Sequence, residues 1–282
     1  MKHRAFDISP MQAAPPSISV LMAAHNAAGT LAESVESILS QSFEDFEFIV
    51  VDDGSTDDTA AILARYARQD LRLRIVTQAE NTGLTIALNR GLEQIRGRYI
   101  ARQDADDASY PDRLQKQFDF LESRPDVALC GGNCDNLYPG GLETRWGWTP
   151  EETLQTSVFL KTPFPHSTAM MRATVALSLG GYDESFATAQ DMEFWMRFAK
   201  NGSVAMLPDP LIRRRISPGA ISVRRRWRQF YDAFRARWRH NTPGRRAAVL
   251  YHSLRSLLIG LLPERIIALK HNLKGNVGND KM

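Results

Sequence analysis

Apolar residues in the first half of the chain follow two alternating patterns. Short, nearly continuous apolar runs predict buried strands, and between them apolar residues recur every three or four positions, which predicts amphipathic helices. The predicted strands are residues 18–22, 46–51, 71–76, 98–102 and 127–130, and the predicted helices begin near residues 30, 59, 84 and 111. Thr30 and Glu33 have the spacing of a capping box at the first helix start. Strands that alternate with helices predict an α/β fold, with a mostly parallel, Rossmann-like sheet flanked by helices.

The second half of the chain has a weaker pattern. Residues 131–165 are rich in Gly, Pro, Trp and Thr and predict no regular element, but order returns at 168–171, with a turn at 180–183, a helix at 191–200 and a strand at 204–207. A chain of 282 residues fits one catalytic domain with an appendage. We expect that domain at 17–222, with a donor half at 17–130 and an acceptor half at 131–222. Residues 1–16 have no apolar run and several prolines, which predicts a flexible tail.

Arginine is concentrated near the C-terminus. Residues 213–246 contain twelve arginines and one acid, Asp232, giving a net charge of +11, whereas the rest of the chain, with 23 basic and 31 acidic residues, has −8. The same region carries two apolar stripes at helical spacing, separated by Pro243 and Gly244. The stripe positions are Val223, Trp227, Phe230, Tyr231, Phe234 and Trp238, then Leu250, Tyr251, Leu254, Leu257, Leu258 and Leu261. We therefore expect residues 223–282 to form an amphipathic, basic helical extension.

Three interpretations of this extension stay open. The stripes could pack on the catalytic domain, residues 223–262 could lie on an anionic membrane surface, or the arginines could bind nucleic acid. Because no known nucleic-acid module accompanies the arginines, we expect no nucleic-acid partner. The second stripe is too short to span a bilayer and is interrupted by His252 and Arg255.

Cysteine use and glycine patterns exclude several protein classes. Cys130 and Cys134 are the only cysteines, and no histidine lies near them at zinc spacing, so a disulfide framework is excluded and a reducing cytosol fits. The sequence contains no Gly-x-Gly-x-x-Gly or Walker-type loop for a dinucleotide or for ATP.

Three carboxylates, Asp104, Asp106 and Asp107, directly follow the strand predicted at 98–102. Open α/β sheets bind ligands at the carboxyl ends of their strands. A Mg²⁺ or Mn²⁺ ion that also holds a diphosphate needs only one or two carboxylates from the protein. An Asp cluster alone also suits a solvated turn, but this position predicts a metal site.

Five motifs occur in a fixed order and extend this interpretation. They are residues 18–26, Val50-Val51-Asp52-Asp53-Gly54-Ser55-Thr56-Asp57, Asn81-x-Gly83-Leu84 with Leu88-Asn89, Ala101-Arg102-Gln103-Asp104-Ala105-Asp106-Asp107, and Pro111-Asp112-Arg113-Leu114. From about residue 17 to residue 222 the chain closely resembles the family 2 glycosyltransferases of GT-A fold. The resemblance implies transfer of a sugar from a nucleotide diphosphate donor, expected to be a UDP-sugar, with inversion at the anomeric carbon and with Mg²⁺ or Mn²⁺.

The resemblance also assigns residues to the donor side. Asp53 would accept a hydrogen bond from the donor base, and the edge formed by Ala23, His25 and Asn26 would line the nucleotide pocket, with His25 where the family usually has Tyr. Asp104 would lie near the ribose and the metal, and Asp106 would bind the metal directly. The further donor-side residues are Asn81, Gly83, Arg102 and Arg215, the last in a segment where the family's His is replaced by Ser217.

On the acceptor side, the resemblance makes Asp191 the catalytic base, with Gln190 in place of the family's Glu. A carboxylate suits this role because a base must deprotonate the incoming hydroxyl as it attacks. The alternative is that Asp191 only caps its helix. His166, Gly181 and Trp195 fall on the acceptor or diphosphate side, although His166 could equally be a structural hydrogen-bonding group.

These inferences predict a metal-dependent, inverting glycosyltransferase for cell-surface polysaccharide or glycolipid synthesis. We expect it in the cytoplasm, either free or peripheral on the inner face of the plasma membrane, with a saccharide or lipid-linked acceptor. A sugar nucleotidyltransferase would need a glycine-rich basic loop for triphosphate, which residues 25–30 lack. A catalytically silent sugar-nucleotide-binding protein would suit Gln190 and Ser217, but not the retained Asp106 and Asp191.

Overall fold

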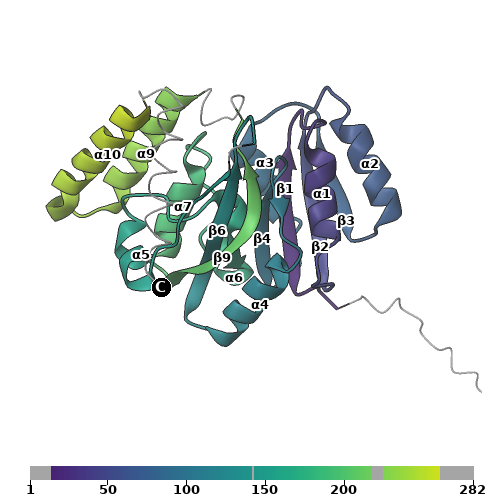
Figure 1. Ribbon diagram of the computed structural model, residues 1–282, viewed down its shortest axis with the longest axis horizontal. Helices are drawn as coiled ribbons and strands as arrows, with labels where there is room; N and C mark the ends of the chain where they lie inside the picture. Colours follow the sequence, from purple (N-terminus) through teal and green to yellow (C-terminus); the bar gives the residue numbers. More distant parts are fainter. Residues whose placement is uncertain (1–13, 142, 218–224, 261–282) are drawn as a thin grey trace, which may run out of the picture.

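The computed structural model describes residues 14–141, 143–217 and 225–260, and its centre is a nine-stranded sheet flanked by helices (Figure 1). The sheet order is β3-β2-β1-β4-β8-β6-β9-β5, with β7 paired to β6 beside this path. The strands are β1 (Ile18–Ala24), β2 (Phe46–Asp53), β3 (Leu73–Gln78), β4 (Tyr99–Asp104), β5 (Ala108–Ser109), β6 (Val127–Leu137), β7 (Glu143–Arg145), β8 (Met170–Arg172) and β9 (Ser203–Arg215). The strands of both expected halves of the domain therefore belong to one sheet.

The longer strand pairings are parallel. Strands β3, β2, β1 and β4 form a continuous parallel half, and β6 pairs in parallel with β9, whereas the antiparallel pairings through β5, β7 and β8 are short. The prediction of a mostly parallel sheet is thus confirmed. The helices before residue 200 are α1 (Leu31–Leu39), α2 (Thr59–Gln69), α3 (Leu84–Leu92), α4 (Arg113–Ser123), α5 (Glu151–Ser157), α6 (Ala173–Ser178) and α7 (Gln190–Phe198), with a short 3₁₀ turn η1 at His166–Thr168.

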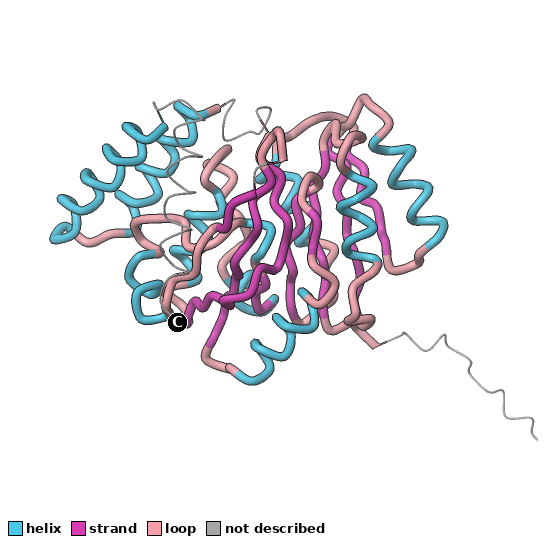
Figure 2. The backbone as a smooth tube through the Cα atoms, viewed as in Figure 1, coloured by secondary structure: helices cyan, strands magenta, loops and turns pink. Residues whose placement is uncertain are grey.

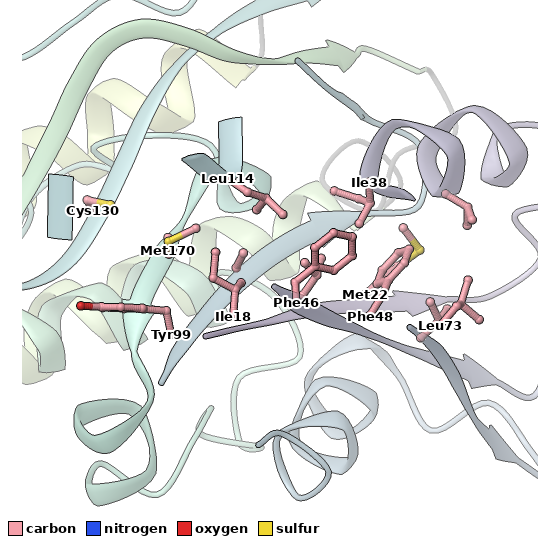
Figure 3. Close-up of a cluster of buried hydrophobic side chains, with 14 of the residues drawn as sticks. Ile18, Met22, Ile38, Phe46, Phe48, Leu73, Tyr99, Leu114, Cys130 and Met170 are labelled. Carbon is pink, nitrogen blue, oxygen red and sulfur yellow. The ribbon is translucent and has the colours of Figure 1, made fainter. Parts of the chain in front are cut away.

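Successive side chains of the central strands enter two separate cores, because neighbouring residues of a strand point to opposite faces. On β1, Ile18 and Met22 pack under α1, α2 and α4, in the cluster that Figure 3 shows, whereas Leu21 packs under α3, α6 and α7. Figure 2 shows the same arrangement, with the strands in the middle and helices on either side. Both faces of the parallel half are covered, which explains the nearly continuous apolar runs in its strands.

Glu47 lies at the start of β2, at the end of the sheet away from the Asp cluster, and its side chain is 3% exposed. Its carboxylate accepts hydrogen bonds from Ser19, Arg74 and Arg96. Burial alone would raise the pKa of Glu47, but these hydrogen bonds outweigh it and lower the pKa below the ordinary value of 4.5. This carboxylate fastens β1, β2 and β3 together at their amino ends.

The predicted capping box does not form, which corrects one expectation. Thr30 makes no capping hydrogen bond and its hydroxyl instead donates to the carbonyls of Ala27 and Ala105, while Glu33 pairs with Arg215 at 2.7 Å. Thr30 and Glu33 thus bond to groups that are distant in the sequence instead of capping their own helix. The start of α1 is thereby attached to the loop that carries the Asp cluster.

The segment with no predicted element, residues 131–165, contains the rest of β6 as well as β7 and α5. Its glycines hid the strand: a Cβ on Gly131 would lie 2.1 Å from the ring of Phe164, and one on Gly132 would lie 2.2 Å from Leu211. Glycine inside a strand often marks such a close approach. Cys130 and Cys134 also lie on β6, as free and fully buried thiols, and burial raises the pKa of each to about 12.

The C-terminal extension forms two helices in the described residues, α9 (Arg226–His240) and α10 (Arg246–Gly260), joined by the short turn η2 (Pro243–Arg245). They lie side by side at one end of the molecule, and α9 packs against α7 (Figure 1). The face of α9 that is buried is not its aromatic stripe but the set Asp232, Ala233, Ala236 and Arg237. Val223 and Leu261 of the predicted stripes, and most of the predicted tail at 1–16, lie outside the described residues. No helix of the described residues is long and apolar enough to cross a membrane.

Candidate active site

The carboxyl ends of β1, β2 and β4 meet at one edge of the sheet. The strand register places Ala23 beside Asp104 on one side and beside Val51 on the other. His25 follows β1, and its Nδ1 lies 2.9 Å from the carbonyl oxygen of Asp53. The predicted donor-side residues of the first two motifs are therefore neighbours in space.

Asp53 organises the loop that contains Asn81 and Gly83. One carboxylate oxygen accepts hydrogen bonds from Gln78 Nε2 at 2.8 Å and from the N–H and hydroxyl of Thr82, and the other accepts from the N–H of Gly83 at 2.9 Å. Gly83 has a φ of 96°, a conformation that glycine adopts without strain. Asn81 is exposed on the same loop. Asp53 itself is 3% exposed, so its assigned contact with a base stays a prediction.

Asn26 joins the first motif to the second. It has a positive φ of 49°, its N–H donates to Ser55, and its side-chain oxygen accepts from the N–H of Thr56 at 2.8 Å. The left-handed conformation of Asn26 thus turns the chain from β1 toward the turn after β2. This interaction holds the edge of the sheet that the nucleotide was predicted to contact.

Arg102 and Asp104 form a buried ion pair at the end of β4. Arg102 Nη2 lies 2.6 Å from Asp104 Oδ1; the arginine side chain is 1% exposed and the aspartate side chain is 31% exposed. Burial alone would raise the pKa of Asp104, but the charges of Arg102 and Arg214 outweigh it and hold that pKa below its usual value. Asp104 is therefore an anion near neutral pH, with one side open to a ligand.

The two following carboxyl groups have raised pKa values. Burial, with the charge of Asp104, raises the pKa of Asp106 to about 6 and that of Asp107 to about 8. Asp107 is engaged within the protein, because it accepts hydrogen bonds from the hydroxyl of Ser167 and from the N–H of Arg215. Asp104 and Asp106 remain as the pair of carboxylates available to a cation. No cluster of three or more potential ligands from His, Cys, Asp and Glu occurs in the described ranges.

Arg113, from the fifth motif, holds the loop of the Asp cluster in place. Its guanidinium is completely buried and donates to the carbonyl of Arg102, to the side-chain oxygen of Gln103 and to the hydroxyl of Ser109. Gln103 in turn donates to the carbonyl of Asp107 at 2.8 Å. The motif is thus explained by a buried hydrogen-bond network behind the site.

Asp191 lies in the first turn of α7, which begins one residue earlier than predicted. The N-cap position belongs to Ala189, whose φ of 53° is left-handed and which makes no side-chain cap, so Asp191 is not the N-cap residue. Burial raises the pKa of Asp191; the N–H of Met192 opposes this effect and the charge of Asp104 adds to it. The influence of Asp104 on this pKa indicates that the two carboxylates lie on the same side of the molecule, although they come from distant parts of the chain.

His166 and Tyr182 lie in the same site. His166 Nε2 is 2.8 Å from the hydroxyl of Tyr182, and the His166 ring meets the rings of Tyr182 and Trp195 edge-on, each at 5.6 Å. Desolvation, with the charge of Arg102, lowers the pKa of His166 to about 3, so the imidazole is neutral at neutral pH. It can exchange hydrogen bonds with a ligand but carries no charge to offset a diphosphate.

Trp195 has an exposed fraction of 0% and stacks within the core on Phe194. In this conformation it offers no surface to an acceptor, which corrects its direct assignment to the acceptor side. Trp195 instead packs against the ring of His166 from the side of the core. The sequence pattern misled because it does not distinguish an aromatic residue packed behind a site from one exposed within it.

Gly181 and Asn89 explain two further motif positions. The side chain of Asn89 donates to the carbonyl of Tyr182 and accepts from its N–H, each at 2.9 Å. A Cβ on Gly181, which has a φ of 71°, would lie 2.7 Å from the oxygen of Asn89. Gly181 is therefore required for the turn that presents Tyr182 to the site, rather than for a contact of its own.

Arg214, which the sequence did not single out, is the arginine of β9 that affects the carboxylates. Its charge helps to lower the pKa of Asp104 and opposes the rise that burial causes in the pKa of Asp106 and of Asp191. Arg215, the predicted diphosphate contact, points to the other side, where its guanidinium pairs with Glu33 of α1. Neighbouring side chains of a strand point to opposite faces of the sheet, but the sequence does not tell which of the two faces borders the site.

The C-terminal extension touches the site through α7. Asp232 of α9, completely buried, accepts hydrogen bonds from the N–H and hydroxyl of Thr188 at 3.2 and 2.8 Å, two residues before the start of α7. His240 lies 3.0 Å from Glu193, which also pairs with Arg197. α9 is therefore built into the support of the helix that carries Asp191.

Comparison with known proteins identifies this arrangement. The model of the family described as glycosyl transferase family 2 matches residues 19–178, more than half of the chain. The chain belongs to glycosyltransferase family 2. This family 2 chain is 39% identical over 191 residues to the putative glycosyltransferase EpsE of Bacillus subtilis, covering 66% of the chain and 68% of EpsE. It is 31% identical over 192 residues to the putative teichuronic acid biosynthesis glycosyltransferase TuaG of the same organism, covering 67% of the chain and 75% of TuaG.

Solved structures confirm the GT-A fold of this glycosyltransferase. The mannosyltransferase PcManGT from Pyrobaculum calidifontis, solved with GDP-Man and Mn²⁺, superposes with a TM-score of 0.65 at 20% identity, covering 99% of this chain and 80% of that one. S. aureus TarS residues 1–349, solved with UDP, superposes with a TM-score of 0.62 at 21% identity, covering 78% of this chain. The match spans 64% of that TarS chain, somewhat less than two thirds of its length.

Proposed function

We propose that this glycosyltransferase moves a sugar from a nucleotide diphosphate donor, expected to be a UDP-sugar, to a hydroxyl of a saccharide or lipid-linked acceptor, with inversion at the anomeric carbon. The observation that supports the proposal best is that the charge of Asp104, at the end of β4, acts on Asp106 and on Asp191 of α7, the helix whose Trp195 contacts His166. The similarity to TuaG, named for teichuronic acid biosynthesis, supports a role in cell-surface polysaccharide or glycolipid synthesis.

Asp191 is the proposed base. Its raised pKa, caused by burial, makes it a better proton acceptor than an ordinary carboxylate. As the acceptor oxygen forms its bond to the anomeric carbon, the bond from that carbon to the diphosphate oxygen breaks, and Asp191 takes the hydroxyl proton. Attack from the face opposite the leaving group inverts the configuration.

Asp104 and Asp106 are the proposed metal ligands, and their chemistry fits a hard divalent cation. Both supply carboxylate oxygens: Asp104 pairs with Arg102 but its side chain is 31% exposed, and the pKa of Asp106 is raised partly by the neighbouring anion, a repulsion that a cation would relieve. Bound there, Mg²⁺ or Mn²⁺ would supply positive charge for the diphosphate leaving group. PcManGT, of similar fold, was solved with Mn²⁺.

The remaining predicted residues have supporting roles in the proposal. Asp53, His25 and Asn26, with Ala23, form the base and ribose side, and the loop of Asn81 and Gly83 closes it. Arg214 faces the diphosphate, a role that we transfer from Arg215 because of its influence on the carboxylates. His166 and Tyr182 lie between donor and acceptor as neutral hydrogen-bonding groups.

A donor screen tests the proposal. The purified full-length protein is incubated with UDP-, GDP- and dTDP-sugars, with Mn²⁺ or with EDTA, and nucleoside diphosphate release and thermal stabilisation are measured. We expect one donor to be hydrolysed slowly and to stabilise the protein, both only with metal, and Asp106→Asn to abolish the metal-dependent binding while the melting temperature without ligand is retained.

Two results would contradict it. Failure of every donor to bind or react would favour a silent binding protein. Release of pyrophosphate from a nucleoside triphosphate and a sugar phosphate would instead identify a nucleotidyltransferase. Once a donor and acceptor are known, the anomeric configuration of the product, determined by NMR, tests inversion directly.

A further inference from the structure

The outer faces of α9 and α10 expose an unusual amount of apolar surface. On α9, Trp227, Tyr231 and Trp238 are 59%, 58% and 40% exposed. The exposed apolar residues of α10 are Leu250, Tyr251, Leu254 and Leu258. Large apolar residues exposed in this number on two neighbouring helices usually mark an interaction site. These seven residues are called the arm surface below.

The arm surface is not needed to attach α9 to the domain. α9 docks through its opposite face, where Ala233 and Ala236 pack against Phe186, Met192 and Met196. The interpretation that the apolar stripes pack on the catalytic domain is therefore wrong for the exposed members of the stripes. Their large side chains remain available for a partner.

Arginine surrounds the arm surface, and α9 and α10 carry no exposed acid in their described residues, although Arg239 pairs with Asp183 of the catalytic domain at 2.7 Å. Asp232, the single acid between residues 210 and 263, is completely buried and is occupied by Thr188 and by Arg228 at 2.9 Å. Arg226 lies over the ring of Trp227, and Arg246 lies 3.6 Å over the ring of Trp238. The partner should therefore combine negative charge with an apolar interior.

We propose that the arm surface docks on an anionic membrane, with α9 and α10 lying along the lipid headgroups. Trp and Tyr favour the headgroup region, leucines can enter the acyl boundary, and arginines attract anionic lipid. Tyr231, Phe234 and Trp238 also border an open hollow of about 470 Å³, so their rings are accessible from outside. A nucleic acid would match the charge but would leave the leucine face of α10 without a partner.

Docking of α9 on a membrane would also affect the helix that carries Asp191. α9 holds Thr188 through Asp232 and approaches α7 through His240, so the membrane-bound element is the same one that supports the helix of Asp191. The enzyme would then work beside the surface on which a lipid-linked acceptor is held. The docking proposal itself does not depend on the proposed chemistry.

Flotation with vesicles tests the proposal. The full-length protein is mixed with vesicles of phosphatidylcholine alone, or of equal parts phosphatidylcholine and phosphatidylglycerol, at low and high salt. We expect binding only to the anionic vesicles, weakened by salt because salt screens the arginine contribution. Trp227→Ala with Trp238→Ala should reduce binding about tenfold or more, and Arg225→Gln with Arg226→Gln on the order of twentyfold, at roughly fivefold for each arginine.

Matched controls lie at the opposite edge of the molecule. Leu71→Ser removes an apolar side chain that is 93% exposed after α2, and Arg68→Gln removes a charge from α2. Both controls should leave flotation unchanged. Melting curves and donor binding show whether each variant is folded, and Leu254→Ser with Leu258→Ser replaces the tryptophan pair if that pair unfolds.

Several outcomes would overturn the proposal. They are no flotation with anionic vesicles at low salt, equal flotation with neutral vesicles, or flotation that the arm variants do not change. Light scattering that shows a dimer lost in the tryptophan pair would assign the arm surface to a second copy of the chain. RNA or DNA binding that the same variants abolish, without lipid binding, would assign it to nucleic acid.

Discussion

Asp232 and Thr188 are hydrogen-bonded through both the N–H and the hydroxyl of the threonine, across 44 residues of sequence. The aspartate is the single acid among the twelve arginines of residues 213–246, and the threonine immediately precedes the left-handed residue that starts α7. One buried carboxylate thus connects the extension to the turn that sets the position of Asp191. A sequence rich in arginine gives no hint that its one acid has this role.

Thr188→Val should lower kcat on the order of tenfold without changing donor affinity, because it loosens the turn before Asp191 and leaves the nucleotide edge intact. Asp232 would then lack its hydroxyl partner. Steady-state kinetics together with donor titration separate the two effects. Thr188→Ser, which keeps the hydroxyl, should restore most of the activity; an equal loss in both variants would argue against the positioning role.

Asp191→Asn should lower kcat by on the order of a hundredfold or more, whereas donor affinity should hardly move, since a base acts on the acceptor only in the transition state. Gln190→Ala, at the neighbouring position, is the matched control for damage to the start of α7. Single-turnover assays and calorimetry with the donor measure both quantities. Near-normal transfer by Asp191→Asn would reduce this residue to a structural part of the helix.

Arg214→Gln and Arg215→Gln should have opposite consequences. Removing the charge of Arg214 should weaken nucleoside diphosphate binding about tenfold, because its charge acts on the site carboxylates and the proposed diphosphate position. Removing the charge of Arg215 should leave nucleoside diphosphate binding unchanged. It should lower the free energy of unfolding by at most about 1 kcal/mol, since the ion pair with Glu33 is partly exposed. Calorimetry and melting curves test the contrast, and the reverse order of effects would return the role to Arg215.

Glu47→Gln should lower the free energy of unfolding by about 2 kcal/mol near neutral pH and leave kcat unchanged, because it removes the charge of a buried carboxylate that accepts hydrogen bonds from two partly exposed arginines far from the site. The folded-state pKa of Glu47 lies below its ordinary value of 4.5, so its contribution is present above that value and is lost as pH falls below it. Denaturant titrations of both proteins from about pH 6 to about pH 3 should show the difference shrinking. A difference independent of pH would contradict this account.

The sequence predicted the sheet well where burial sets the pattern. The apolar runs at β1, β2 and β4 occur because both faces of those strands are covered by helices. Such runs can be recognised in the sequence without knowledge of the contacts between distant segments. β6 was predicted only as far as Cys130, because Gly131 and Gly132 make room for Phe164 and Leu211 from distant segments. Thr30 misled for the same reason, since its hydroxyl found a partner 75 residues away.

The candidate site could be predicted by residue type but not by orientation. The charge of Asp104 acts on both Asp106 and Asp191, in agreement with the motifs, but the assignment of these residues to one catalytic site stays a prediction. The motifs could not show that Trp195 lies behind His166, or that Arg215 pairs with Glu33 while the charge of Arg214 acts on the carboxylates. These facts depend on which face of α7 and of β9 turns inward, and contacts between distant elements decide that.

Both native thiols lie inside β6, with no exposed surface and with pKa values of about 12. A maleimide reacts with an accessible thiolate, so it should leave Cys130 and Cys134 untouched in the folded protein. A single cysteine introduced on the surface, as in Leu71→Cys or Leu254→Cys, should therefore take a fluorescent label selectively without removal of the native cysteines. The glycine-lined strand that obscured the sequence pattern thus makes the protein suited to site-specific labelling.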